Sequence, residues 1–328
     1  MDWTRILGQV AGEAVAPTTA AYALAAVGLN IHFGLTGLLN MGQAGFMLLG
    51  AYGFAIATIA GWPLWAAVAV AVATAVVFAM ILGIPTLKLR GDYLAIVTIA
   101  AAEIVRLIGR STSMTAITGG NAGLAGDQYK RTFEAMSPLP DGASTLGPWS
   151  YSNNLSNSWW LRIVAWALVG LACLLVWRLR HSPWGRVLKG VREDEDAVRS
   201  LGKNVFAYKM QSLVLGGVLG AVAGILFVLP RAVQADSLGR PVTFYIWTIL
   251  LLGGAAAVFG PVLGSIILWT VLMLIKTVMR DVVPPTVMRP EQIEMFGWVL
   301  VGVALMLLVI FRPQGILGDK KELAIHDH

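Results

Sequence analysis

The feature that most constrains this chain is a long run without charge: residues 14–87 contain no Asp, Glu, Lys or Arg. As one straight helix this run would extend about 110 Å, whereas the hydrocarbon core of a bilayer is about 30 Å thick. The run must therefore cross the bilayer about three times. Charged residues make up 13% of the sequence, about half of the usual share in soluble proteins. The sequence predicts a polytopic α-helical membrane protein and excludes an ordinary soluble enzyme.

Windows of about 20 apolar residues predict nine transmembrane segments in a single domain, residues 1–328. They lie near residues 15–33, 42–60, 64–84, 92–109, 159–177, 210–229, 243–258, 261–276 and 295–311. The uncharged run from Pro241 to Ile275 is too long for one untilted crossing, and Gly260-Pro261 would break a helix in its middle. Two crossings, or two half-helices meeting inside the protein, both fit this run. The predicted fold is therefore all-α, with about nine segments and with eight or ten left open.

Basic residues favour the cytoplasmic side of a membrane, so their distribution predicts the orientation. Residues 178–209 hold eight Lys and Arg, which makes this stretch a predicted cytoplasmic loop. The same orientation places Lys88, Arg90 and the basic C-terminal tail in the cytoplasm. The N-terminus and an external loop of about 110–158 then lie outside. That loop is rich in Gly, Ser, Thr, Asn and Pro, which favours turns over a packed domain.

Motifs for catalysis or cofactor binding are absent from the sequence. Without a G-x-x-x-x-G-K-[ST] loop, the chain cannot bind ATP by that route. The sequence also lacks H-E-x-x-H, C-x-x-C and G-x-S-x-G patterns, and Cys173 is its only cysteine. The net charge of +6 is explained by basic cytoplasmic loops and does not indicate a nucleic-acid partner. We therefore expect no enzyme, no catalytic residue, no metal and no cofactor in this chain.

A predicted cytoplasmic segment, residues 184–202, has the pattern of an amphipathic helix. Its apolar face comprises Val187, Leu188, Val191, Val198 and Leu201. Its polar face comprises Arg192, Glu193, Asp194, Glu195, Asp196 and Arg199, and Gly202 is a suitable helix stop. An anionic cytoplasmic leaflet would repel the four consecutive carboxylates of residues 193–196. The pattern therefore favours docking on a partner protein over the alternative, a helix that lies on the membrane surface.

This segment resembles the cytoplasmic signature of ABC-importer permeases of the branched-chain amino acid family, through Gly185-Arg186, Val191-Arg192-Glu193-Asp194-Glu195 and Gly202. Further matches follow in order along the chain: Gly28-Leu-Asn30, Gly34-Leu-Thr-Gly37, Asn40-Met-Gly-Gln43, Gly50-Ala-Tyr52, Leu87-Lys-Leu-Arg-Gly-Asp-Tyr-Leu-Ala-Ile-Val-Thr98, Glu103-Ile-Val-Arg106, Thr118-Gly-Gly-Asn-Ala-Gly-Leu124, Leu252-Gly-Gly, Phe259-Gly-Pro-Val-Leu-Gly264 and Phe311-Arg-Pro-Gln-Gly-Ile-Leu-Gly318. Chance is a poor explanation for matches that span residues 28 to 318. Importers of this family contain two types of permease. The Arg-Glu-Asp-Glu run and the Arg-Pro-Gln-Gly ending resemble the LivM type.

The resemblance implies a subunit of the branched-chain amino acid/ribose permease type, in the bacterial inner membrane, with the N-terminus outside and the C-terminus in the cytoplasm. A second, LivH-type permease would complete the pore, and an external substrate-binding protein would deliver branched-chain or related amino acids. Two cytoplasmic ABC ATPase subunits would use ATP and Mg²⁺, and the 186–201 helix would dock on one of them. The candidate coupling residues are Arg186, Arg192, Glu193, Asp194, Glu195 and Gly202.

Polar side chains inside predicted spans are costly unless they have partners or a function. One group surrounds a Gly-rich break between the first two segments: Asn30, His32, Asn40 and Gln43. Glu103 and Arg106 are one helical turn apart and can pair. Such residues can tie helices together, and His32 is expected to do so rather than to relay protons. Alternatively, broken helices offer polar groups to a substrate, and the candidates to line a translocation path are Asn30, Asn40, Gln43, Thr98 and Glu103.

Other functions stay open at this stage. The same architecture could carry urea or short amides. A stand-alone secondary transporter could couple protons through Glu103 or His32, and an intramembrane enzyme would need a site without a known motif. A docking helix for an ATPase favours the importer, because a self-sufficient carrier needs no such contact.

Overall fold

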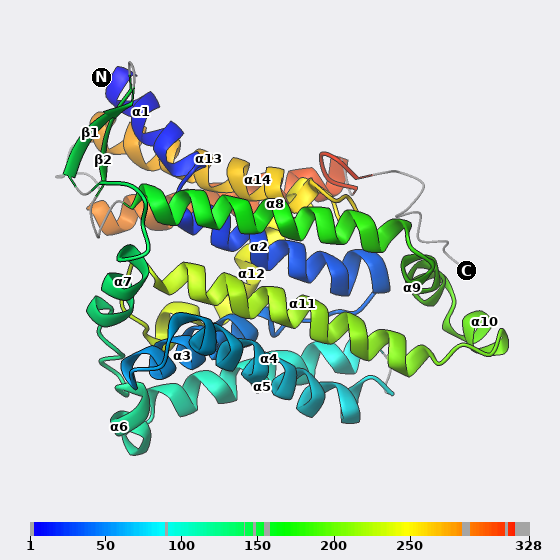
Figure 1. Ribbon diagram of the computed structural model, residues 1–328. Helices are drawn as coiled ribbons and strands as arrows, with labels where there is room; N and C mark the ends of the chain where they lie inside the picture. The colour runs from blue at the N-terminus through cyan, green and yellow to red at the C-terminus, as the bar shows by residue number, and fades with distance from the viewer. Residues whose placement is uncertain are drawn as a thin grey trace.

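The computed structural model describes residues 3–88, 91–140, 142–146, 149–153, 158–283, 289–311 and 314–318. Most of them belong to a bundle of helices that run side by side (Figure 1). The bundle helices are α1 (Trp3–Ala14), α2 (Pro17–Asn30), α3 (Gln43–Ile59), α4 (Leu64–Thr86), α5 (Gly91–Arg110), α8 (Trp159–His181), α11 (Val205–Val228), α12 (Arg240–Gly253), α13 (Gly260–Val282) and α14 (Pro290–Phe311). A π-helix, η1 (Ile31–Leu35), continues α2.

A helix lies at the position of each predicted segment. Within the described ranges, five helical segments are long and apolar enough to cross a bilayer: Trp3–Leu35, Leu64–Thr86, Trp159–His181, Val205–Val228 and Gly260–Val282. Helix α3 is apolar but shorter. The helical membrane architecture is therefore confirmed, whereas the count of nine spans stays a prediction.

The two ends of the bundle carry different elements, as Figure 1 shows. At one end, called the α7 end, lie η2 (Thr112–Met114), α6 (Thr115–Thr118), α7 (Asp127–Glu134), β1 (Gly142–Leu146), β2 (Trp149–Asn153) and η3 (Ala235–Leu238). At the other, called the α9 end, lie α9 (Pro183–Glu193) and α10 (Glu195–Ser200). Strands β1 and β2 form an antiparallel hairpin that pairs Gly142 with Asn153, an element that the all-α prediction did not include.

Several contacts hold the α7 end together. An antiparallel bridge joins Leu124 to Val233. The buried hydroxyl of Tyr129 donates a hydrogen bond of 2.6 Å to the carbonyl of Arg231, and burial raises the pKa of Tyr129 to about 12. Arg5 of α1 forms an ion pair of 2.7 Å with Asp281 at the end of α13. These contacts fix the connections between helices at the face where the long loop lies.

Helices α2 and α11 form the centre of the bundle because glycines let them approach closely. A Cβ added at Gly28 would lie 2.5 Å from the carbonyl oxygen of Gly216, and one at Gly220 would lie 2.7 Å from Nε2 of Gln43. At Gly224 an added Cβ would collide with the carbonyl of Met47 on α3. The stripe of Gly216, Gly220 and Gly224 thus lets α11 pack closely against α2 and α3.

Two breaks interrupt the bundle. Residues 37–42 have no helical structure between the end of the π-helical segment and the start of α3 at Gln43, and Gly37 there has a φ of +74°. Residues 254–259 separate α12 from α13, with a φ of +108° at Gly254 and +65° at Ala256. The second break ends at Gly260-Pro261, where the sequence predicted one. Both breaks expose backbone groups inside the bundle that other residues must satisfy.

Candidate functional site

Five neutral polar residues around the first break form the central polar cluster: His32, Thr36, Asn40, Gln43 and Ser212. All are fully or almost fully buried. The Asn40 amide donates to Nδ1 of His32 at 3.0 Å and to Oε1 of Gln43 at 3.1 Å. Nε2 of His32 lies 3.1 Å from the carbonyl of Leu213, an acceptor, so the proton of the neutral ring belongs on Nε2. His32 is thus hydrogen-bonded through both nitrogens, as expected for an interhelical tie.

Gln43 and Ser212 extend these bonds to α2 and α11. Nε2 of Gln43 donates to the carbonyls of Ala25 and Gly216, both at 3.2 Å. The Ser212 hydroxyl donates to the carbonyl of Ile31 at 3.1 Å and lies 2.7 Å from the Thr36 hydroxyl. Every amide hydrogen of Asn40 and Gln43 therefore has a partner, and the cluster joins α2, the first break and α11.

Asn30 connects the first break to the second. Its Oδ1 accepts a hydrogen bond of 2.8 Å from the N–H of Ala256, and its Nδ2 donates one of 2.9 Å to the carbonyl of Ala257. Ala256 has the positive φ noted above, a conformation that costs free energy in a residue with a Cβ. Asn30 therefore stabilises an unfavourable turn at the start of α13.

Thr98 belongs to the same region from the side of α5. Its hydroxyl accepts a hydrogen bond of 3.0 Å from the N–H of Met41, and it is fully buried. The structure thus brings together four of the five path candidates, namely Asn30, Asn40, Gln43 and Thr98, as buried and bonded groups. Their role in a translocation path stays a prediction.

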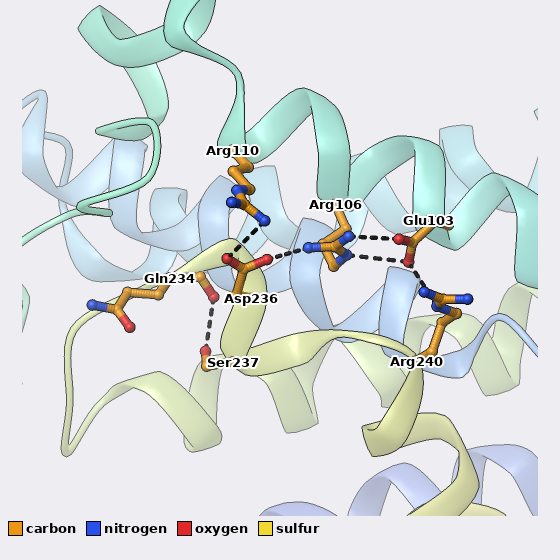
Figure 2. Close-up of polar contacts among 7 residues, drawn as sticks. All are labelled: Glu103, Arg106, Arg110, Gln234, Asp236, Ser237 and Arg240. Carbon is orange, nitrogen blue, oxygen red and sulfur yellow. Dashed lines mark hydrogen bonds and ion pairs between the residues drawn. The ribbon is translucent and has the colours of Figure 1, made fainter.

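Glu103, the fifth candidate, lies apart from them in a charged network at the α7 end, made of Glu103, Arg106, Arg110, Asp236 and Arg240. Figure 2 shows these side chains in a row with alternating signs. Arg106 donates to both carboxylate oxygens of Glu103, at 2.5 and 3.1 Å, and pairs on its other side with Asp236. The predicted pairing of Glu103 with Arg106 within one helical turn is confirmed.

The other three members of the network were not predicted. Arg110 lies 3.5 Å from Asp236, and Arg240 lies 3.5 Å from Glu103. Asp236 belongs to η3, and Arg240 begins α12, about 130 residues after α5 in the chain. Sequence spacing identifies partners only within one helix, so nothing in the sequence pointed to contacts between these segments.

A small cavity lies beside the network. Glu103 and Arg240 line it together with Thr243 and six apolar or glycine neighbours: Met41, Ala44, Ile99, Ala102, Leu238 and Gly239. Its volume of about 10 Å³ has room for about one water molecule. Thr243 also accepts a hydrogen bond of 3.1 Å from the N–H of Ala44, at the start of α3. The cavity therefore lies between the charged network and the first break.

The coupling segment is residues 183–202 at the α9 end, and it differs from the predicted single helix. Helix α9 ends at Glu193 and α10 begins at Glu195, because Asp194 caps α10 by accepting from the N–H groups of Asp196 and Ala197 at 2.9 and 3.0 Å. The break also turns Leu201 outward, 79% exposed, although it was predicted on the apolar face. Gly202 follows with a φ of +75°, so its predicted role as a helix stop is confirmed.

The charged side chains of this segment divide between an exposed face and a face that packs on the bundle. Arg186, Glu193, Asp194 and Asp196 are exposed, the Glu193 side chain to 73%. Glu195 pairs inward with Lys209 of α11 and is half-buried.

The assignment of Arg192 to the outer polar face was wrong. Only 13% of its side chain is exposed, and its guanidinium donates a hydrogen bond of 2.5 Å to the carbonyl of Gly34 at the end of η1. Helical spacing explains this, because Arg192 lies four residues after the buried Leu188 and therefore on its face.

Arg180, near the end of α8, makes a parallel contact with the second break. Its guanidinium donates a hydrogen bond of 3.0 Å to the carbonyl of Ala256, whose N–H is held by Asn30. The α8–α9 region thus contacts η1, directly before the first break, and the second break itself, each time through an arginine and a backbone carbonyl.

The geometry is that of a helical membrane protein whose interrupted helices hold bonded polar groups. Arginines of the α8–α9 region are hydrogen-bonded to the backbone of these helices. Among the described residues, no group of three or more His, Cys, Asp and Glu side chains could hold a metal ion.

Comparison with known proteins identifies the family. The model of the family described as branched-chain amino acid transport system / permease component matches residues 13–311, so the chain belongs to this family of transport permeases. It is 31% identical, over 92% of its length and 69% of the relative's, to the high-affinity branched-chain amino acid transport system permease protein LivM of Escherichia coli. A probable LivM permease of Methanocaldococcus jannaschii is 25% identical, with 91% of both chains covered.

Similarity to the other permease type is lower. The high-affinity branched-chain amino acid transport system permease protein LivH of Escherichia coli is 24% identical, over 90% of this chain and 91% of the relative. The predicted LivM-type resemblance is therefore confirmed, as is the prediction of a transport subunit that is not an enzyme. No solved structure gives a significant match to the chain.

Proposed function

We propose that this chain is the membrane subunit of an ATP-driven importer for branched-chain or related amino acids in the bacterial inner membrane. The family match over residues 13–311 and the names of the LivM relatives support the substrate class. In this proposal a LivH-type permease completes the pore, an external binding protein delivers the substrate, and two ABC ATPases use ATP and Mg²⁺. The chain itself needs no cofactor.

The proposed orientation places the α9 end in the cytoplasm and the α7 end outside. Residues 178–209, with eight Lys and Arg, belong to the α9 end, and basic loops are retained in the cytoplasm. The N-terminus is then external and the C-terminus cytoplasmic. The binding protein would dock at the α7 end, and the ATPases at the α9 end.

The observation that carries the proposal is the pair of arginine contacts from the α8–α9 region to the two breaks. Arg192 reaches the carbonyl of Gly34, and Arg180 reaches that of Ala256. An ATPase that moves the exposed side of α9 and α10 would act on both breaks at once. This supports coupling through Arg186, Glu193, Asp194 and the Gly202 turn as outward contacts, with Arg192 and Glu195 transmitting movement inward.

The breaks themselves are the proposed inner part of the translocation path. Broken helices commonly form substrate paths in membrane transporters because their backbone groups are available to a ligand. In the state described here, Asn30, Asn40, Gln43 and Thr98 use their polar atoms on each other and on backbone. A path would open when movement of α9 releases some of these bonds.

The test is uptake of labelled leucine in cells that lack only this chain, with and without the gene restored. The expected result is loss of uptake in the deletion, recovery on restoration, and competition by excess isoleucine or valine. Uptake that persists in a strain without redundant leucine carriers would contradict the amino acid assignment. Competition by urea alone would instead support the alternative cargo on the same architecture.

A second measurement separates the importer from a stand-alone secondary transporter. Uptake by the importer should persist when a protonophore removes the proton gradient, provided that cellular ATP is maintained. It should stop when the partner ATPase carries a substitution in its phosphate loop. Proton-coupled uptake would show the opposite dependence on both treatments, and the bonded state of His32 argues against it.

A further inference from the structure

We propose that Glu103 and Arg240 form the first binding site for the substrate within this chain, a site for a zwitterionic α-amino acid with an apolar side chain. The inference rests on the proposed importer function and adds the site, the residues and the charge requirement. It starts from the charged network at the α7 end, which is drawn in Figure 2.

The network is costly if its only role is structural. Arg106 and Glu103 have side chains that are 16% and 21% exposed, on a helix of a membrane protein, where charged groups are unfavourable without a function. Arg110, Asp236 and Arg240 are about half exposed, at 50%, 49% and 61%. Ion pairs with this exposure contribute little to stability because water screens them.

The arrangement of the charges matches the two charged groups of an α-amino acid. Such a substrate carries its ammonium and its carboxylate on one carbon, and it therefore needs a protein carboxylate and a guanidinium close together. Glu103 and Arg240 provide these groups 3.5 Å apart. Glu103 would accept hydrogen bonds from the ammonium, and Arg240 would donate to the carboxylate.

Glu103 and Arg240 can separate without loss of the rest of the network. Two hydrogen bonds from Arg106, at 2.5 and 3.1 Å, hold Glu103 in place on α5. Arg240 lies on a different element, the first turn of α12, and makes the longer contact of 3.5 Å. Binding would therefore exchange the Glu103–Arg240 pair for two pairs with the substrate, which conserves the charge balance.

The cavity beside the pair supplies the third requirement, an apolar surface for the side chain. Met41, Ile99 and Leu238 line it, and Glu103 and Arg240 lie on its wall. Its volume of about 10 Å³ is too small to hold an amino acid in this state. Separation of α12 from α5 would enlarge it next to Thr98 and the first break, so the site lies directly before the proposed inner path.

The test measures equilibrium binding of labelled leucine to the whole importer, with its partner permease and ATPases, in lipid nanodiscs without binding protein or nucleotide. The competitors are valine, isoamylamine without a carboxylate, 4-methylpentanoate without an ammonium, and urea. We expect valine to compete, each analogue with one charge to compete about tenfold more weakly or worse, and urea not to compete.

Two variants assign the charges to residues. Glu103→Gln should lower leucine affinity about tenfold or more and abolish the preference for leucine over 4-methylpentanoate. Arg240→Gln should lower it by a similar factor and abolish the preference over isoamylamine. A structural tie would not produce this selective loss, because its removal would weaken all ligands alike.

The matched control is the Arg5–Asp281 pair, which has similar exposure, 54% and 21%, at the same end of the bundle and does not line the cavity. Arg5→Gln and Asp281→Asn should leave affinity and selectivity unchanged. The proposed site is overturned if all four variants act alike, if Glu103→Gln and Arg240→Gln leave binding unchanged, or if the wild type binds no leucine.

Failure of this site and failure of the proposed function give different results. ATP-driven leucine uptake by the same preparation with binding protein, but no leucine binding without it, would overturn the site and leave the importer function intact. Absence of ATP-driven leucine uptake in the complete wild-type system would overturn the proposed function, and the zwitterion site with it.

Discussion

The central polar cluster and the charged network are both polar groups within a helical bundle, but they are satisfied in different ways. The central cluster is neutral and fully or almost fully buried, and its amide hydrogens are all used by side chains or backbone. The network is charged, between 16% and 61% exposed, and held by ion pairs across three elements. Neutral groups that are fully bonded fix one arrangement of helices, whereas partly hydrated charges can exchange partners. In the state described here, the comparison assigns stability to the first region and ligand exchange to the second.

The largest effect should follow from blocking the close approach of helices at the central cluster. A Cβ at Gly216 would collide with the His32 ring and the carbonyl of Gly28, and Gly216→Leu adds a still larger side chain. We expect little or no folded protein in the membrane. The control is Gly170→Leu on α8, where an added Cβ has nothing within 4 Å. The yield of folded protein is measured for both variants by immunoblotting of membrane fractions and by size-exclusion chromatography in detergent. Equal yields would contradict the assigned packing.

Loss of a bonded amide in the cluster should have the next largest effect. Asn40→Leu removes the partners of His32 Nδ1, Gln43 Oε1 and the N–H of Gly42, all of them buried. Buried polar groups without partners are costly, so the expected loss is about 3 kcal/mol or more, seen as a lower Tm in detergent. The comparison variant is Gln234→Leu, which alters an exposed amide at the α7 end. A Tm of Asn40→Leu as high as that of Gln234→Leu would show that the cluster is not a stabilising element.

An intermediate effect is expected where the coupling segment meets the first break. Arg192→Gln removes the guanidinium that bonds the Gly34 carbonyl but leaves the exposed face of α9 unchanged. ATPase subunits should still co-purify, while uptake per ATP hydrolysed falls about tenfold. Glu193→Lys on the exposed face should do the reverse and abolish co-purification. If Arg192→Gln also loses the ATPase, Arg192 acts in docking and not in transmission.

Sequence patterns predicted the parts of this fold that depend on local composition. Apolar runs located the helices, and Gly260-Pro261 marked the start of α13 at the second break. The gathering of Asn40 and Gln43 at a Gly-rich break was also predicted. The partner of Gln43 on α11, the carbonyl of Gly216, lies 173 residues away in the chain, and no spacing rule links such positions.

Other features were predicted wrongly or missed, for specific physical reasons. Asp194 was taken as a surface charge, but a side chain that caps a helix fixes a break that apolar periodicity does not register. The inward direction of the Arg192 side chain could have been predicted, because Arg192 lies four residues after Leu188. Asp236 and Arg240 were missed because contacts between distant segments depend on how helices pack, which a single sequence does not encode in a readable pattern.

The smallest effect, and the one that most sharpens the comparison, concerns the stability contribution of the network. Glu103→Gln removes a charge whose partner Arg106 keeps its pair with Asp236, and its other partner, Arg240, is 61% exposed and therefore stays hydrated. The lost contact with Arg240 is screened by water, and the new amide oxygen can still accept a hydrogen bond from Arg106. The free energy of unfolding should therefore fall by no more than about 1 kcal/mol, with a correspondingly small change in Tm. Asp281→Asn, which alters a pair of similar exposure, should change Tm equally little. Uptake separates the two, since only Glu103→Gln should reduce it. A loss of stability comparable to that of Asn40→Leu would make the network a structural tie and remove the distinction between the two regions.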